Sequence, residues 1–304
     1  MTAISVNGLS KRYATITALD RVSLSVEEGE IFGFLGPNGA GKSTFINILL
    51  DFARPTDGTA ELFGHDCQSE GVAARERVGV LPEGYSVFDR LTGLQHIEYA
   101  VRSKNADDDP IEILDRVGVR EAADRRASDY SKGMKQRLVL GMSLVDDPDL
   151  LILDEPTSGL DPNGAAEIRS ILREESERGA TIFFSSHILE QVEAICDRVA
   201  ILQEGELVAV DSIDGLRQSI GGGTKLLIDV NELDDSTAEA VRTVDGVETA
   251  TVRDGSTLEV TCTNDAKMNV MVELQGLGGD VVNFRTEEAS LEDMFVAYTG
   301  GRRE

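Results

Sequence analysis

Short apolar runs alternate with polar or amphipathic stretches along the first 215 residues of the chain. Two of these runs, at 150–154 and 181–184, are almost wholly aliphatic or aromatic and have polar neighbours, a pattern typical of buried parallel strands. A polar helix is predicted between them at 163–178. Because strands that alternate with helices favour a parallel sheet covered by helices, this part of the chain is predicted to have an α/β fold.

The remaining elements of this part are shorter, and turn residues separate them. A mostly helical stretch is predicted at about 89–147. The other predicted elements are strands at 4–6, 22–26, 31–35, 59–63, 78–81, 199–202 and 207–210, and helices at 42–52 and 188–196.

A second domain is predicted after the low-complexity run Gly-Gly-Gly-Thr at 221–224, which we interpret as a linker. The chain would then divide into residues 1–220 and 221–304. The second part shows the order β-α-β-β-α-β, which is typical of a small α+β ferredoxin-like domain. Its predicted elements are strands at 225–230, 247–252, 257–262 and 280–285, helices at 234–244 and 265–275, and a short closing helix at 291–298.

The clearest chemical signal is the run at 36–44, which fits the phosphate-binding loop (P-loop) pattern G-x-x-x-x-G-K-[ST]. A triphosphate needs several backbone N–H groups pointing inward at once, and a glycine-rich turn that opens a helix supplies them. The predicted strand before the run and helix after it disfavour a simple surface turn. We expect a nucleoside triphosphate as the ligand, with Lys42 on its β- and γ-phosphates and the Ser43 hydroxyl on Mg²⁺. The residues of the loop are Gly36, Pro37, Asn38, Gly39, Ala40, Gly41, Lys42, Ser43 and Thr44.

Two acidic residues, Asp154 and Glu155, end the apolar run that begins at residue 150. A strand here would deliver Asp154 beside the P-loop, where its carboxylate can hold Mg²⁺ through water. The adjacent Glu155 would polarise an attacking water as a general base. Buried strands often end in Asp, so the signal gains its weight from the P-loop upstream.

The run at 130–137, Tyr-Ser-Lys-Gly-Met-Lys-Gln-Arg, resembles the Leu-Ser-Gly-Gly-Gln signature of the ATP-binding cassette (ABC) family. Residues 158–161 resemble the D-loop of that family, His187 its switch histidine, and Tyr13 the aromatic residue that stacks on adenine. The order and spacing of these motifs agree with the family over residues 2–215. The resemblance implies an ABC nucleotide-binding domain: a P-loop NTPase fold with a parallel sheet core, an antiparallel β subdomain and a helical subdomain.

Several of these residues could have a purely structural role instead of a functional one. His187 could be a hydrogen-bonded structural group, and Tyr13 could serve packing alone. Asp161 could cap the helix that begins near residue 162, with or without a functional role. His65 and His96 match no motif, and we interpret them as ordinary surface or packing residues.

The chain also departs from the family pattern. Glu83 stands where the family usually has a glutamine that contacts Mg²⁺ and the attacking water; an exposed turn glutamate is the alternative. Glutamate can still bind the cation, but it adds a negative charge beside the triphosphate. The signature keeps Ser131 and Gly133, the positions that approach the γ-phosphate. Its replaced positions are Tyr130, Lys132 and Met134.

In the ABC family the signature of one subunit faces the nucleotide on the P-loop of another, so the resemblance implies a dimer, with itself or with a paralogue. Ser131, Gly133 and Asp161 would then contact the partner's nucleotide. The expected catalytic residues are Lys42, Glu83, Glu155 and His187, and the expected metal-binding residues are Ser43, Glu83 and Asp154.

The resemblance also implies a separate membrane permease, which would select the substrate and dock beside Glu83 and residues 85–100. The variant Ser-Lys-Gly-Met at 131–134 and the closing segment 290–300 resemble ATPases of the ABC-2 type and drug-exporter branch. One alternative is a soluble single-cassette ATPase that serves cofactor assembly or another non-transport role. Another is a nucleotide sensor that does not hydrolyse ATP.

Composition limits the class of protein further. Hydrophobic residues make up 41% of the 304, yet no apolar run approaches the roughly 18 residues that span a bilayer. The first residues lack the basic-then-apolar pattern of a signal peptide. The three cysteines form no C-x-x-C pair, which disfavours a disulfide framework or a zinc site and indicates a reducing compartment. We therefore expect a cytoplasmic protein, held at the inner face of the membrane by its permease.

The chain is strongly acidic, with 29 basic and 55 acidic residues and a net charge of −26. Such a surface opposes unaided binding to nucleic acid or to anionic lipid, so we expect neither. It resembles proteins of salt-accumulating cytoplasms, where high ionic strength screens the repulsion between like charges. We expect a halophilic source, with an ordinary acidic protein as the alternative.

Overall fold

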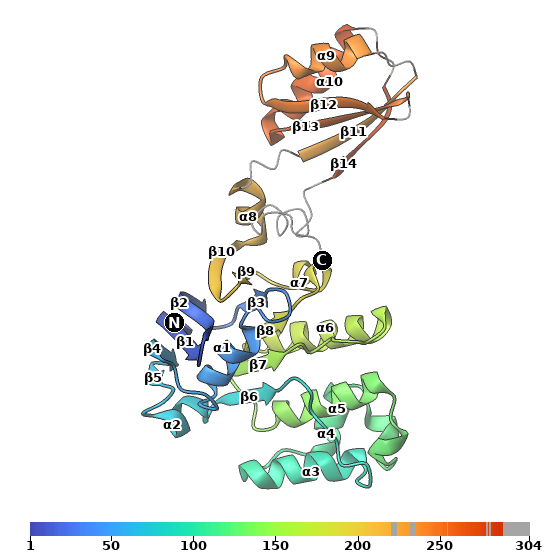
Figure 1. Cartoon of the computed structure of the whole chain (residues 1–304). Helices are drawn as coiled ribbons and strands as arrows, with labels where there is room; N and C mark the ends of the chain where they lie inside the picture. The colour runs from blue at the N-terminus through green and yellow to red at the C-terminus, as the bar shows by residue number, and fades with distance from the viewer. Residues whose placement is uncertain (220–223, 232–234, 254, 278, 280, 288–304) are drawn as a thin grey trace. The chain divides into compact units, whose positions relative to one another are not determined.

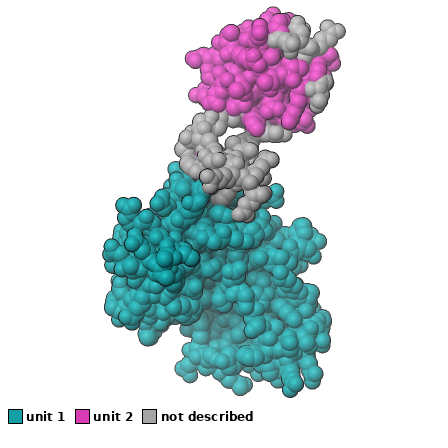
Figure 2. Space-filling view, viewed as in Figure 1, with its two compact units in different colours: residues 1–212 teal, residues 213–304 magenta. Residues whose placement is uncertain are grey.

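The computed structural model describes residues 1–219, 224–231, 235–253, 255–277, 279 and 281–287. The chain forms two compact units, residues 1–212 and 213–304 (Figure 1, Figure 2). The second unit begins with a short helix, α8 (Ile213–Ser219), that the sequence analysis did not predict. Most of the predicted linker lies outside the described residues, so the boundary at residue 220 stays a prediction.

A six-stranded sheet forms the centre of the first unit, in the order β10-β9-β3-β8-β7-β6. The pairs from β9 to β6 are parallel, and β10 adds an antiparallel edge. Every residue of β3, β7 and β8 is buried, which explains their unbroken apolar sequences. The strands are β3 (Ile31–Leu35), β6 (Val78–Leu81), β7 (Leu150–Asp154), β8 (Thr181–Ser186), β9 (Arg198–Gln203) and β10 (Glu206–Ser212).

A second, antiparallel sheet has the order β2-β1-β4-β5. Its first two strands are 12 residues long, much longer than predicted, because turn-forming residues such as Asn7 and Gly8 stay within the strand, where the pairing shifts register. A short helix, α2 (Gly71–Arg75), follows β5. The strands are β1 (Thr2–Tyr13), β2 (Ile16–Glu27), β4 (Asp57–Leu62) and β5 (His65–Asp66).

One helix, α1 (Lys42–Leu49), shares a hydrophobic core with both sheets. Its Phe45 ring lies 4.7 Å from the ring of Phe34 on β3 and 5.8 Å from that of Phe183 on β8, measured between centroids. These aromatic contacts hold the start of the helix against the central strands. Two further helices accompany the central sheet, α6 (Pro162–Glu177) and α7 (Leu189–Glu193).

A helical region lies next to β6 (Figure 1). Thr92 and Gln95 form a reciprocal capping box at the start of its first helix, and Asp109 and Ser131 cap the other two. These caps mark where each helix begins within the broad helical stretch predicted at 89–147. The helices are α3 (Gly93–Lys104), α4 (Pro110–Arg116) and α5 (Lys132–Leu144), with 3₁₀ turns at Arg120–Ala122 and Ala127–Asp129.

A cluster of ion pairs joins this helical region to α6. Arg116, the last residue of α4, donates to both carboxylate oxygens of Glu175 at 3.3 and 2.6 Å, and to Asp147 at 2.7 Å. Arg178 donates to Glu175 at 2.6 Å. Glu175 is only 4% exposed, so this carboxylate depends on the two arginines for its charge balance.

Glu175→Gln is therefore expected to lower the free energy of unfolding by about 3 kcal/mol, because it leaves two arginines around a neutral group. The matched control is Asp147→Asn, whose side chain is 79% exposed in its pair with Arg116. The control should cost less than about 1 kcal/mol. Urea unfolding followed by circular dichroism measures both, and equal small losses would contradict a special role for the buried carboxylate.

The second unit contains an antiparallel four-stranded sheet in the order β12-β13-β11-β14, with a core of its own. This order and the chain path agree with the predicted β-α-β-β-α-β arrangement. The predicted helix at 291–298 lies outside the described residues. The elements are β11 (Thr224–Val230), α9 (Asp235–Arg242), β12 (Val247–Arg253), β13 (Thr257–Cys262), α10 (Lys267–Gly276) and β14 (Val281–Glu287), with a 3₁₀ turn at Asn264–Ala266.

Among the described residues, no helix combines the length and the apolar character that crossing a membrane would require.

Candidate active site

The P-loop connects β3 to α1 in a backbone conformation that requires glycine. Gly39 and Gly41 have φ angles of 82° and 113°. A Cβ atom on Gly41 would lie 2.4 Å from the Ala18 carbonyl oxygen, and one on Gly36 would lie 2.5 Å from that of Leu202. These two glycines therefore have no room for a side chain, and the loop is held close against its neighbours.

The start of α1 differs from the starts of α3 to α6, which all have side-chain caps. Gly41 occupies the cap position of α1 and has no side chain to accept from the first N–H groups. The N–H groups of the first helical turn lack partners inside a helix. They and the helix dipole are therefore available to an anionic ligand, which is how P-loops hold phosphate.

A cavity of about 330 Å³ opens over the helix start. Gly36 and Ala40 belong to the loop but do not line it: the Gly36 carbonyl accepts from Lys42 at 2.7 Å, and Ala40 packs in the core. The lining residues are Ile16, Thr17, Ala18, Pro37, Asn38, Gly39, Gly41, Lys42, Ser43, Thr44, Glu83 and Glu155.

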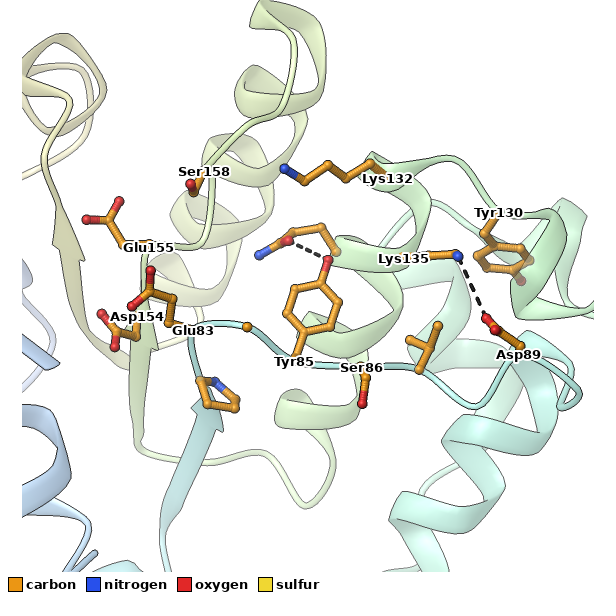
Figure 3. A pocket seen from close by; sticks show the side chains of 14 residues that line it. Glu83, Tyr85, Ser86, Asp89, Tyr130, Lys132, Lys135, Asp154, Glu155 and Ser158 are labelled. Carbon is orange, nitrogen blue, oxygen red and sulfur yellow. Dashed lines mark hydrogen bonds and ion pairs between the residues drawn. The ribbon is translucent and has the colours of Figure 1, made fainter. Parts of the chain in front are cut away.

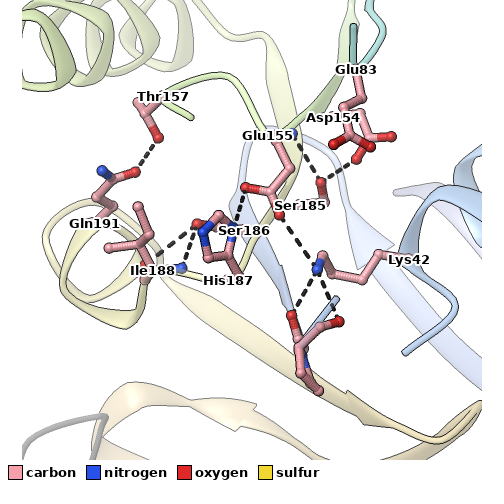
Figure 4. A network of polar contacts seen from close by, with 12 residues as sticks. Lys42, Glu83, Asp154, Glu155, Thr157, Ser185, Ser186, His187, Ile188 and Gln191 are labelled. Atoms are coloured by element: carbon pink, nitrogen blue, oxygen red, sulfur yellow. Dashed lines mark hydrogen bonds and ion pairs between the residues drawn. The ribbon is translucent and has the colours of Figure 1, made fainter. Parts of the chain in front are cut away.

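Lys42 and Glu155 form a buried ion pair at the base of this cavity. The Lys42 Nζ atom lies 3.4 Å from Glu155 Oε1, and the two side chains are 6% and 8% exposed (Figure 4). Glu155 Oε1 is buried and accepts no hydrogen bond within the described part of the chain. This oxygen and the ammonium group are thus placed to interact with a ligand as well as with each other.

Glu155 reaches this position through a constrained backbone. Its φ angle is 51°, in the left-handed region that residues other than glycine seldom adopt. Its N–H donates to the Ser185 hydroxyl at 3.0 Å, and that hydroxyl donates to Asp154 (Figure 4). Ser185 therefore ties β8 to both acidic residues at the end of β7, a role that the sequence analysis missed.

The second oxygen of Glu155 lies 2.9 Å from Nδ1 of His187, which follows β8. One carboxylate thus stands between a lysine ammonium and an imidazole. The hydrogen bond orients Glu155 toward the P-loop cavity, because the ring and the ion pair with Lys42 hold opposite sides of the carboxylate. A carboxylate fixed in this way can accept a proton from a bound water.

Oxygen ligands for a hard cation gather beside this pair. The Ser43 hydroxyl donates to Glu83 at 3.4 Å, and Glu83 lies next to Asp154 in Figure 4. Among the described residues, no three His, Cys, Asp or Glu side chains are placed to hold a metal ion by themselves. Mg²⁺ is usually held by one or two carboxylates together with phosphate oxygens of the substrate, and the oxygens of Ser43, Glu83 and Asp154 have the chemistry for the protein's share.

Tyr13 does not line the P-loop cavity. It ends β1, 46% exposed, and the Lys11 ammonium lies 4.7 Å from the centre of its ring. Ile16, Thr17 and Ala18 at the start of β2 line the cavity instead. The sequence analysis missed these three residues because neither their type nor their spacing marks them as ligands.

The signature and D-loop residues line a separate cavity of about 370 Å³ that contains no P-loop residue. Ser131, Gly133 and Asp161 all contribute to it. Asp161 also caps α6, accepting from the Gly164 N–H at 2.7 Å, so the helix-cap interpretation is confirmed. Apart from Tyr13, the predicted site residues therefore form two groups within one chain.

A third cavity, of about 640 Å³, lies between the acidic residues of the sheet and the helical region (Figure 3). Glu83, Asp154 and Glu155 line one side of it. On the other side Tyr85 donates to Gln136 at 2.6 Å, and burial raises the pKa of the Tyr85 phenol. Through this contact the segment after Glu83 is bound to α5.

His96 is a buried packing residue, as its lack of a motif suggested. Its Nε2 atom accepts from the Phe88 N–H at 3.0 Å, and its Nδ1 atom lies 2.7 Å from the Thr92 carbonyl oxygen. The ring thereby fixes the segment before α3. His65, by contrast, lies at the surface, 3.5 Å from Glu70.

Comparison with known protein families matches two parts of the chain. The family described as "ABC transporter" matches residues 19–158. The family described as "ATP-binding protein DrrA1-3-like, C-terminal domain" matches residues 212–299. The first match spans the P-loop, the signature and both acidic residues.

Several full-length relatives are resistance or transport proteins. The chain is 34% identical to the daunorubicin/doxorubicin resistance ATP-binding protein DrrA of Streptomyces peucetius, covering 98% of this chain and 92% of that protein. It is 29% identical to the linearmycin resistance ATP-binding protein LnrL of Bacillus subtilis, covering 98% of each. It is 34% identical to the bacitracin transport ATP-binding protein BcrA of Enterococcus faecalis, covering 98% and 96%. These relatives give no support to a halophilic source.

Solved structures agree with the fold. The "ATP binding subunit of ABC transporter" is 29% identical, with a TM-score of 0.66 over 72% of this chain and 94% of that one. An ATP-binding cassette described as dimeric and bound to ADP and Pi is 23% identical, with a TM-score of 0.63 over 69% and 98%. The predicted P-loop NTPase fold is thus confirmed. The chain belongs to the ATP-binding proteins of ABC transporters, whose cassette binds and hydrolyses ATP.

Proposed function

We propose that this chain energises a separate membrane permease of the ABC-2 exporter branch through ATP-driven closure of a dimer. The observation that carries the proposal is the contact of the buried Lys42–Glu155 ion pair with His187 at the P-loop, with the signature residues in a different cavity. Relatives that match almost the full chain are named for drug resistance or bacitracin transport. This favours a transporter subunit over a cofactor-assembly ATPase.

Each residue of the P-loop group has a distinct task in this proposal. The P-loop amides and Lys42 bind the phosphates of ATP, and Ser43, Glu83 and Asp154 would hold Mg²⁺. When bound, Mg²⁺ neutralises phosphate charge and fixes the oxygens in place. Glu155 accepts a proton from the attacking water, while the hydrogen bond from His187 keeps its carboxylate oriented.

The cavity lined by Ser131, Gly133 and Asp161 supports the two-subunit arrangement. Those residues share no cavity with the P-loop of their own chain, so we propose that they contact the nucleotide held by a second copy. Two copies would then form two shared sites. Hydroxyl and backbone donors at the start of α5 would stabilise charge on the γ-phosphate, as an arginine finger does elsewhere.

The permease contact is proposed for the helical region beside Glu83. Phe88 and Tyr99 expose 59% and 56% of their surface there, and their ring centroids lie 6.3 Å apart. An exposed aromatic pair is typical of protein contact surfaces. Because the chain is acidic, we propose that it reaches the inner face of the membrane through this protein contact and not through anionic lipid or nucleic acid.

A direct test is flotation of the full chain with membranes that contain or lack an ABC-2 permease from the same organism. Membrane association that requires the permease, together with ATPase activity that the permease stimulates, is the expected result. Equal association with protein-free anionic vesicles would contradict the proposed mode of binding.

Glu83 tests the proposed Mg²⁺ ligands. Glu83→Gln keeps an oxygen ligand and should leave turnover within about twofold, whereas Glu83→Ala should lower turnover by about 10- to 100-fold. ATP affinity should change little in both, because it depends mainly on the P-loop. Phosphate-release kinetics over a range of Mg²⁺ concentrations measures this, and wild-type turnover in the alanine variant would identify Glu83 as an ordinary turn residue.

A further inference from the structure

Lys132 is a signature residue to which the site described above gives no role. It is the first residue of α5, directly after the cap residue Ser131, and its side chain is exposed. The side chain extends toward the D-loop, as Figure 3 shows for Lys132 and Ser158. A Cβ atom on Gly159 would lie 2.1 Å from the Lys132 Nζ atom, so the ammonium group rests directly against this glycine.

The Lys132 ammonium has neither an ion pair nor a hydrogen bond within the described residues. Lys132 lines both the signature cavity and the cavity beside Glu83, and the other cations that line these two cavities are paired. Lys135 lies 3.9 Å from Asp89, and Arg137 lies 3.5 Å from Glu167. A lysine without a carboxylate partner is unexpected in a chain with 55 acidic and only 29 basic residues. Its charge is available to an anion from outside the chain.

The position of Lys132 indicates which anion this could be. The residue lines the signature cavity with Ser131 and Gly133, and it also lines the larger cavity with Glu83 and Glu155. It does not line the P-loop cavity of its own chain. An anion that contacts Ser131 and Gly133 would therefore meet this ammonium, whereas an anion on the chain's own P-loop would not.

We propose that Lys132 contributes its ammonium group to the phosphates of the nucleotide held by the second subunit, an inference that rests on the two-subunit site proposed above. The charge also offsets the carboxylate that Glu83 adds to the shared site. Charge-assisted hydrogen bonds to phosphate oxygens are among the stronger polar contacts, and lysine supplies them as a compact point charge. Lys132 would thus favour the ATP-closed dimer and leave ATP binding by the open subunit unaffected.

The test uses full-length chains in the Glu155→Gln background, where slow hydrolysis preserves the dimer. Lys132→Gln should weaken Mg-ATP-dependent dimerisation by about tenfold, measured by analytical ultracentrifugation. Lys132→Arg should retain most of the dimer affinity, because it keeps the charge. Lys135→Gln is the matched control, because it removes the same charge one turn along α5, where Lys135 pairs with the exposed Asp89. It should change the dimer affinity by less than about twofold.

Two further measurements separate this inference from the proposed function. Mg-ATP affinity under conditions where the chain is monomeric should be equal in all variants, and thermal melts should show that each is folded. Equal dimerisation of the Lys132→Gln and Lys135→Gln chains would overturn the role of Lys132 alone. Weaker ATP binding by monomeric Lys132→Gln would also overturn it. If the Glu155→Gln parent itself forms no dimer with Mg-ATP, the two-subunit site fails and the inference fails with it.

Discussion

Glu155→Gln is expected to bind Mg-ATP and to accumulate as a closed dimer whose turnover is lowered about 10²–10⁴-fold. The amide keeps the size of the side chain and one hydrogen-bond acceptor, but it cannot take a proton from water. Lys42 still lies at the base of the cavity with the P-loop intact, so ATP binding should persist. Phosphate release measures turnover, and the increase in molecular mass on adding Mg-ATP measures closure.

The substitution also removes the negative charge that Lys42 and His187 share. ATP affinity should therefore rise slightly, because the carboxylate no longer repels the triphosphate. A suitable control is Glu239→Gln, an exposed glutamate of the second unit, which should leave turnover unchanged. Wild-type hydrolysis by Glu155→Gln would show that the general-base assignment is wrong. Absence of the dimer at every salt concentration would rule out closure for the isolated chain.

The P-loop could be predicted from the sequence because its requirements are local. Glycines with positive φ or with a neighbouring carbonyl at the Cβ position cannot be replaced, so their spacing is visible in the chain itself. The fully buried strands β3, β7 and β8 were visible for a similar reason, since burial on both faces demands an unbroken apolar run.

Contacts between distant segments could not be derived from the pattern alone. The placement of Glu155 between Lys42 and His187 depends on β3, β8 and β7 being neighbours in that order, which no short run encodes. The link through Ser185 depends on the same strand order. The resemblance to the ABC family identified Glu155 and His187 as separate candidates and did not predict their contact. Their catalytic roles stay predictions.

The antiparallel sheet shows a second kind of limit. The strand β1 continues through the turn-forming residues Asn7 and Gly8 with a shift in register, so the sequence analysis predicted only residues 4–6 as a strand. It also singled out Tyr13, a residue type known to stack on bases, and overlooked Ile16 on the facing strand, which lines the cavity. Residue type therefore predicted a candidate, but the fold decides which side chains border the site.

Lys42→Ala is expected to lower Mg-ATP affinity by at least about 30-fold and to prevent ATP-dependent dimerisation. Truncating one partner of a buried charge pair typically costs 2–5 kcal/mol or more, and here the loss leaves Glu155 buried beside the phosphates without its cation. Repulsion between that carboxylate and the triphosphate adds to the lost contact. Binding of a fluorescent ATP analogue measures the affinity, and wild-type binding would show that Lys42 does not contact the nucleotide.

The same variant can test whether the sites are shared between chains. Ser131→Arg places a bulky cation at the start of α5, so it should block the shared site while leaving the P-loop of its own chain intact. A mixed dimer of Lys42→Ala and Ser131→Arg chains has one site with Lys42 from one chain and Ser131 from the other, both unaltered. ATP-dependent dimers should therefore appear in the mixture and in neither variant alone. If differently tagged chains never co-purify in Mg-ATP at any mixing ratio, Ser131 does not act across the interface, and the two cavities must serve separate purposes within one chain.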